Sequence, residues 1–135
     1  MAVKRFLVVP LLLVAACKPP SPADQMDAIL SWVATARMTG DAWLQGTTPD
    51  KYTRQTLEQS QQMLQQTGSE LLKSPPPSID SAALDSLLAR SRSHIAEMAR
   101  RVKEKNAPGF RVPWDSLRVD LIAVKQFSDR VEAAQ

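Results

Sequence analysis

The residue types that bind metals or attack substrates are scarce in this chain of 135 residues, which has one histidine and one cysteine. His94 and Glu97 lie three positions apart in a segment with helical periodicity, so both side chains could face one metal ion. A zinc site requires more ligands than these two, and there is no second histidine or cysteine to provide them. We therefore interpret His94 as a solvated or helix-bordering residue and predict no metal site.

A haem held by His94 and one methionine is the other cofactor site that helical segments could form. The CxxCH motif that attaches c-type haem is absent from the sequence. The methionines are better explained as packing residues, because methionine fills irregular gaps in a core. Those in the helical segments are Met26, Met38, Met63 and Met98. We predict that the protein has no cofactor.

Serine is abundant, but a nucleophilic serine needs an activating base and a site that binds the oxyanion. The sequence has neither a glycine-rich nucleophile elbow nor a glycine loop that could cradle a phosphate. The paired carboxylates of Asp24 and Asp27 lie at the start of a helical segment, where the helix dipole already explains them. An enzyme is therefore the least supported class, and we predict that the protein is not one.

Basic side chains gather in residues 90–111, which contain seven basic and two acidic groups and have a net charge of +5. Cations near the C-terminus of a helix complement its dipole, which accounts for those in residues 100–105. Arg90 and Arg92 are poorly explained in this way. The alternative interpretation is a contact surface for anionic headgroups or for an acidic protein partner, and its candidate residues are Arg90, Arg92 and Arg101.

The first 17 residues have the organisation of an export signal. Lys4 and Arg5 provide a positive start, Phe6–Ala16 is an apolar run, and Cys17 follows at once. Eleven apolar residues are too few to cross a hydrocarbon core as a helix, which takes about 20. Residues 14–17, with the sequence Val-Ala-Ala-Cys, resemble the lipobox of bacterial lipoproteins, in which small residues precede the cysteine that is lipidated.

This resemblance implies that residues 1–16 are a signal peptide, cleaved before Cys17, and that Cys17 carries a diacylglycerol and an acylated amino group. Several acyl chains anchor a protein stably, because each buried methylene adds about 0.8 kcal/mol of membrane affinity. Lys18 stands where an aspartate is associated with retention in the inner membrane of enteric bacteria. We therefore expect a lipid-anchored envelope protein, in the outer membrane and facing the periplasm if the host is diderm.

Removal of residues 1–16 leaves a nearly neutral protein. The chain has 17 basic and 14 acidic residues, and the signal contains two of the basic ones, so the mature charge is +1. A globally basic nucleic-acid binder is not supported, and we predict no nucleic-acid partner. Residues 17–22 comprise the lipidated cysteine and a proline-rich tether that is too short to cross the periplasm.

Four amphipathic segments follow the tether, at about residues 23–45, 49–73, 81–105 and from about 113 onward. Mostly apolar residues recur in them at helical spacing, and in the last three segments at alternating steps of three and four, which is typical of one helix face. In the first two segments these residues are Met26, Ile29, Leu30, Val33, Ala36 and Trp43, then Leu57, Ser60, Leu64, Thr67 and Leu71. In the last two they are Leu84, Leu88, Ser91, Ile95, Met98 and Val102, then Leu117, Leu121, Val124, Ser128 and Val131.

Several residues modify these faces. Gly40 lies on the first stripe, where it either admits a close neighbour or marks a bend. Tyr52 flanks the second stripe, and Trp114, Ile122 and Phe127 broaden the fourth. We expect residues 106–109 to end the third helix and Pro113 to mark the start of the fourth.

These segments predict an all-α fold in which residues 23–135 form one domain, an up-down-up-down four-helix bundle, with a bent or open helical array as the alternative. The leading functional hypothesis is a membrane-anchored lipoprotein that serves as an interaction, accessory or assembly subunit of an envelope complex. A carrier of a small hydrophobic ligand or haem is the alternative, in which a cavity would be lined by Trp32, Trp43, Tyr52, Trp114 and Phe127. A modulator of an envelope enzyme is a third possibility.

Overall fold

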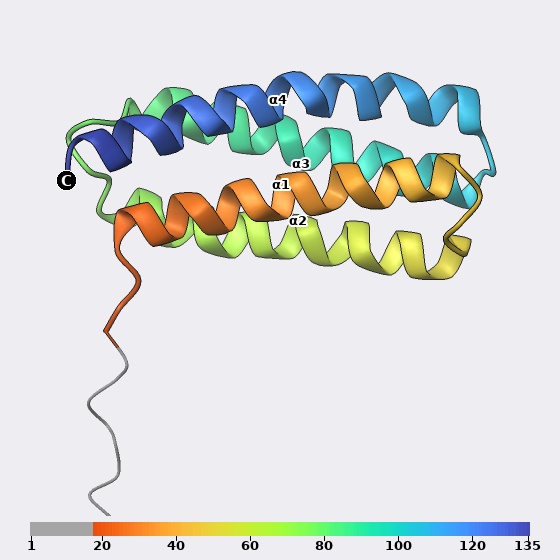
Figure 1. The fold of residues 1–135 in the computed structure, drawn as a ribbon, viewed down its shortest axis with the longest axis horizontal. Coiled ribbons are helices and arrows are strands. Elements are labelled where there is room, and N and C mark those ends of the chain that lie inside the picture. Colours follow the sequence, from red (N-terminus) through yellow and green to blue (C-terminus); the bar gives the residue numbers. More distant parts are fainter. Residues whose placement is uncertain (1–17) are drawn as a thin grey trace, which may run out of the picture.

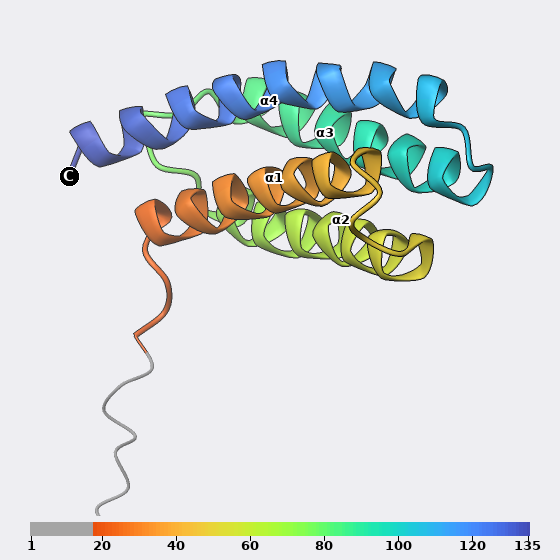
Figure 2. The ribbon, with the colours of Figure 1, turned by 45° about the vertical axis from the view of Figure 1, so that its right-hand side comes forward.

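The computed structural model describes residues 18–135, so the predicted signal peptide and Cys17 lie outside the described residues. The described residues form four α-helices, which are α1 (Pro22–Leu44), α2 (Asp50–Lys73), α3 (Ser81–Lys103) and α4 (Ala107–Ala133). They run alternately in opposite directions along a common axis (Figures 1 and 2). The predicted all-α four-helix bundle is confirmed.

Side chains just before three of the helices fix where they begin. Ser21 and Asp24 form a capping box at α1, in which each side chain accepts a hydrogen bond from the other residue's backbone N–H at 3.1 Å. Asp80 accepts from the N–H of Ala83 at α3, and Asn106 accepts from the N–H of Gly109 at α4. These caps set the residue at which each connection ends and the next helix begins. Because the connections are short, neighbouring helices are antiparallel.

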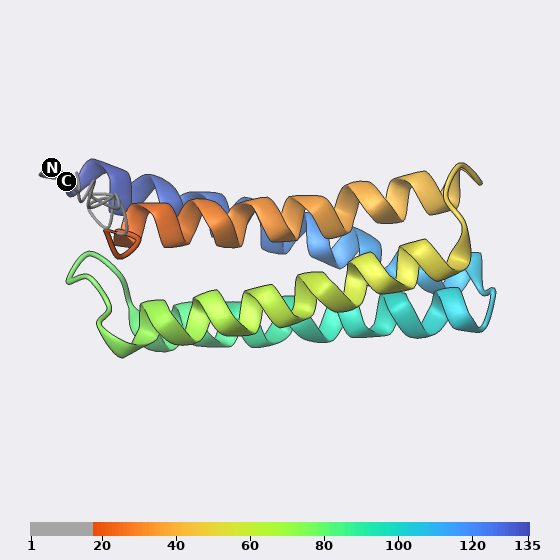
Figure 3. The same ribbon diagram turned by 90° about the horizontal axis from the view of Figure 1, so that it is seen from below.

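The helices occupy the corners of a square, in which α1 packs along α2 and α4, while α3 packs along the same two helices from the opposite corner. Figure 3 shows α1 and α2 from below, with the other two helices behind them. The start of α1, the α2–α3 connection and the end of α4 therefore lie at one end of the bundle, and the other two connections lie at the opposite end (Figure 1).

The core is formed by the predicted stripes with few exceptions. All six stripe residues of α3 are buried. In α1, Leu30 and Trp43 pack against the core but stay partly exposed. In α2, the buried position is Gly68 and not Thr67, because Leu88 of α3 packs onto the bare backbone there. Tyr52 and Ile122 are exposed and do not extend the core, contrary to expectation.

The start of α4 was predicted wrongly. The helix begins at Ala107, six residues before Pro113, and Pro113 lies buried inside it. Pro108 fits the first turn of α4, because the backbone N–H groups there have no partner within the helix and proline therefore loses no helical hydrogen bond. The Asn106 side chain accepts a hydrogen bond from the Gly109 N–H at 2.9 Å. Contrary to expectation, residues 106–109 thus start α4, and α3 ends before them, at Lys103.

One position on the buried face of α4 also differs from the prediction. Asp120 is buried, whereas Leu121 is only partly covered. Position 120 and position 121 both fit steps of three and four between Leu117 and Val124. The apolar side chain of Leu121 made it the predicted core residue, and this prediction was wrong. Among residues 18–135, no helix is long and apolar enough to span a membrane.

Candidate functional site

A buried carboxylate joins α3 to α4. Asp120 of α4 accepts a hydrogen bond from Arg90 Nε at 2.9 Å on one oxygen, and its other oxygen lies 2.6 Å from His94 Nδ1. The Asp120 side chain is 2% exposed, that of His94 22% and that of Arg90 53%. We call Arg90, His94 and Asp120 the α3–α4 cluster. Its buried anion is fully paired, which is how proteins tolerate such a group.

The α3–α4 cluster resembles part of a catalytic or metal site, because a carboxylate on Nδ1 orients an imidazole and leaves its Nε2 atom for chemistry. In residues 18–135, no three histidine, cysteine, aspartate or glutamate side chains gather closely enough to hold a metal ion. The His94 side chain is 22% exposed, so His94 lies at the border of α3 and is not fully solvated. The contacts that the cluster makes are those of a structural link between two helices.

The three arginines expected to form a contact surface do not share one face. Arg90 is bound to Asp120 of α4, whereas Arg92 borders a hollow on the side of α2, next to Glu58 and Gln62. Arg101 lies further along α3 and contacts Glu97 and Glu104 at 3.4 and 3.3 Å. Helical rotation separates Arg92 from Arg90, whereas Arg101 lies on nearly the same side of α3 as Arg90 but about three turns further along the helix.

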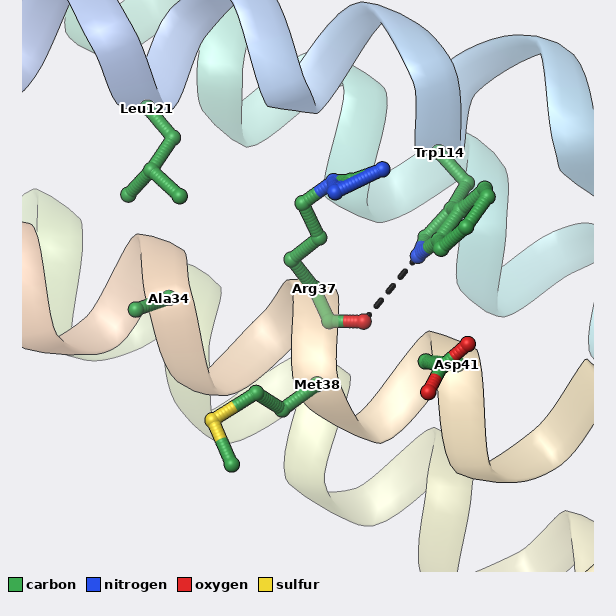
Figure 4. A pocket seen from close by; sticks show the side chains of 6 residues that line it. All are labelled: Ala34, Arg37, Met38, Asp41, Trp114 and Leu121. Atoms are coloured by element: carbon green, nitrogen blue, oxygen red, sulfur yellow. Dashed lines mark hydrogen bonds between the residues drawn. The ribbon is translucent and has the colours of Figure 1, made fainter.

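A surface hollow of about 470 Å³ lies between α1 and α4, on a different seam from the cluster. Six residues line it, and we call it the α1–α4 hollow (Figure 4). They are Ala34, Arg37, Met38 and Asp41 of α1, with Trp114 and Leu121 of α4. Four of the six are apolar, and the Met38 side chain is 73% exposed beside the opening. An exposed apolar concavity of this kind can receive an apolar group of another molecule.

Two contacts hold one wall of the hollow in place. Trp114 Nε1 donates a hydrogen bond to the main-chain carbonyl of Arg37 at 3.0 Å, and the Arg37 guanidinium lies 4.2 Å from the centre of the Trp114 ring (Figure 4). The indole is further supported by Gly40, where an added Cβ would come within 2.8 Å of Trp114 Cδ1. Gly40 therefore admits a close neighbour, the first of its two predicted roles.

The aromatic residues proposed to line an internal ligand cavity are dispersed. Trp43 packs on Phe110 with ring centres 4.7 Å apart, and its Nε1 donates to Asp50 at 2.8 Å. Phe127 is buried under Arg130, and Tyr52 is exposed. Of the five, only Trp114 reaches the α1–α4 hollow.

Sequence reasoning missed Asp120 and Arg37, and it wrongly assigned Met38 to packing, since Met38 is exposed. Asp120 had a usable signal, since it lies three residues after Leu117 and four before Val124, on the buried stripe. Arg37 and Met38 adjoin the buried Ala36, at the margin of the stripe, and nothing local distinguishes them from a solvated edge. Cys17 lies outside the described residues.

No family model matches the chain, and no curated protein or solved structure is significantly similar to it.

Proposed function

We propose that this protein is a lipid-anchored lipoprotein of the bacterial envelope whose helical bundle binds another envelope protein, as an accessory or assembly subunit. The observation that carries the proposal is the α1–α4 hollow, an exposed concavity of about 470 Å³ with Met38 and Leu121 on its walls. The lipobox at residues 14–17 supports the anchor, with Cys17 as the lipidated residue. Lys18 after it favours the outer membrane, facing the periplasm, in a diderm host.

The anchor and the hollow are compatible in space. The tether residues Pro19 and Pro20 border a surface hollow with Gln66 and Glu70 of α2, so the tether lies on the α1–α2 side of the bundle. The α1–α4 hollow lies on another side of α1. A partner can therefore reach it without displacing the tether.

The expected mode of binding is insertion of one apolar side chain of the partner between Met38 and Leu121. A central apolar anchor in a pocket carries most of the energy in many protein interfaces. Arg37 and Asp41 flank the hollow and provide a positive and a negative group for hydrogen bonds at its margin. No catalytic residue is part of this function.

Capture of the partner from detergent-solubilised membranes tests the proposal. We expect Met38→Asp to reduce recovery of a co-purifying protein by about 30-fold, the loss produced by removing a hot spot of about 2 kcal/mol. Val119→Asp is the matched control, because Val119 is exposed on α4 and does not line the hollow. Equal loss in both variants, or in neither, would show that the hollow is not the binding site.

The same experiment includes Cys17→Ser, which separates anchoring from binding. We expect this variant to leave the membrane fraction or to remain as uncleaved precursor, since no described helix can span a membrane. Full processing and membrane attachment of Cys17→Ser would contradict the lipoprotein proposal. Binding of the partner by the detached bundle would then be assessed independently in the soluble fraction.

A second candidate is carriage of a small hydrophobic ligand, which is favoured by the volume of the α1–α4 hollow. Ligand pockets commonly enclose about 300–1,000 Å³, and the hollow falls in that range. Solvent extraction and mass spectrometry of the pure protein would reveal a bound apolar molecule. Haem carriage has no such support, because His94 is not among the residues that line the hollow.

A further inference from the structure

The two ends of the bundle carry opposite charge. We define the anchor end as residues 21–28, 69–85 and 128–135, where the tether enters, and the distal end as residues 41–55 and 99–112 (Figure 1). The anchor end has seven acidic and two basic side chains, a net charge of −5. The distal end has seven basic and three acidic side chains, a net charge of +4. The folded chain is therefore strongly polarised, although its mature net charge is only +1.

Several cations of the distal end are not neutralised within the bundle. Arg100 and Arg101 contact Glu97 and Glu104, and Lys105 lies 3.9 Å from Asp50. Other basic side chains of this end take part in no ion pair within residues 18–135, and they include Lys51, Lys103 and Arg111. Two exposed apolar side chains, Tyr52 and Val112, are one residue from Lys51 and Arg111.

We propose that the distal end is a docking surface for an acidic segment of a partner protein, an inference that rests on the proposed function. The free cations pair with carboxylates of that segment, and Tyr52 and Val112 contact its apolar side chains. Tyrosine and arginine are enriched among the residues that dominate protein interfaces, which supports Tyr52 and Arg111 as central contacts.

The membrane to which the protein is anchored is a poor alternative partner. α1 has 23 residues and is about 35 Å long, so the distal end is about that far from the point where the tether enters. The attraction between basic side chains and anionic headgroups is screened over about 8 Å at physiological salt. The end of the bundle nearest to the tether is acidic, and it would be repelled by the same headgroups.

A second copy of the chain is also a poor partner when both copies are anchored. The basic distal end would have to meet an acidic anchor end, in a head-to-tail arrangement. Copies anchored in one membrane through their tethers present their distal ends on the same side, so opposite ends do not meet. The distal end therefore stays available to a different acidic molecule.

Binding of a labelled oligo-glutamate peptide tests this proposal with the complete lipidated protein, reconstituted in vesicles of phosphatidylcholine. The distal variant carries Lys51→Gln, Lys103→Gln and Arg111→Gln. The matched control removes the same charge from the other half of the bundle, with Lys73→Gln, Lys125→Gln and Arg130→Gln. We expect the distal variant to bind the peptide about tenfold more weakly than the wild type, and the control to stay within about twofold.

Flotation of the vesicles with peptide at low and high salt gives the affinities, and circular dichroism verifies that both variants keep their helices. Wild-type binding should also weaken as salt is raised, because the surface charges are screened. Equal loss in the two variants, or none in either, would overturn the proposal. Stronger capture of phosphatidylglycerol vesicles than of the peptide would overturn it too, in favour of a facing anionic membrane.

The result is separate from the test of the proposed function. Loss of partner recovery in Met38→Asp with unchanged peptide binding by the distal variant would reject only the docking of an acidic segment. Normal recovery in Met38→Asp with a selective loss in the distal variant would reject the α1–α4 hollow and leave the distal end as the contact.

Discussion

α4 packs against two neighbours, and the two seams differ in what they enclose. On the side of α3 the seam closes over a charged side chain, Asp120, which is held by Arg90 and His94. On the side of α1 the seam is narrow at Gly40 and Trp114 but leaves a hollow beside Met38 and Leu121.

The difference shows that a single helix can use one side to hold the bundle together and the other to offer a surface. A paired buried ion fixes register, because any shift of α4 along α3 would leave Asp120 without partners. The α1–α4 hollow has no such requirement, and it can receive an external group without loss of internal bonds. We expect substitutions in the first seam to affect folding and those at the hollow to affect binding.

The largest effect should follow removal of the partners of Asp120. Arg90→Ala with His94→Ala leaves a buried carboxylate unpaired and should lower the free energy of unfolding by about 3–5 kcal/mol. Urea denaturation measures this, with Arg100→Ala as a control because Arg100 makes only exposed ion pairs. Adding Asp120→Leu to the double variant should restore most of the loss. A double variant as stable as the wild type would mean that the cluster does not hold the seam.

Leucines of similar type should separate the fully buried core from the hollow. Leu88→Ala should destabilise the protein by about 2–5 kcal/mol, since Leu88 is completely buried and packs on Gly68. Leu121→Ala should cost only about 1 kcal/mol, because the side chain is partly exposed at the hollow. Thermal unfolding by circular dichroism gives both values. Equal losses would place Leu121 in the core, as its spacing alone predicts.

A smaller effect is expected where helices approach most closely. At Gly40 an added Cβ would lie 2.8 to 3.0 Å from Trp114, Phe110 and Met98, so Gly40→Ala should destabilise by about 1–3 kcal/mol. At Gly68 the one close contact is a Leu88 methyl at 2.7 Å, which can move. The gain in helix propensity should then leave Gly68→Ala within about 1 kcal/mol of the wild type. The reverse order of the two variants would refute this account of the α1–α4 seam.

The connection between α3 and α4 shows where local reading fails. Pro108 and Gly109 are strong signals of a helix end, and the local sequence predicts that role for them. They stand at the start of α4 because proline is tolerated in a first turn and Asn106 caps it. Proline and glycine can thus mark either the end of one helix or the start of the next. Which of the two applies depends on the structure of the chain on both sides.

The sequence by itself determined the four helices, their alternating directions and nearly all of their buried positions. These depend on local interactions, namely the helical repeat, capping within three residues and short connections. The tertiary structure alone decided that Asp120 is buried and Leu121 is not. The partners of Asp120 are 26 and 30 residues away, and whether they meet depends on the rotation and register of α3 against α4. The same is true of the α1–α4 hollow and of the opposite charge of the two ends, because both arise from residues that are distant in the chain and adjacent only after the helices pack.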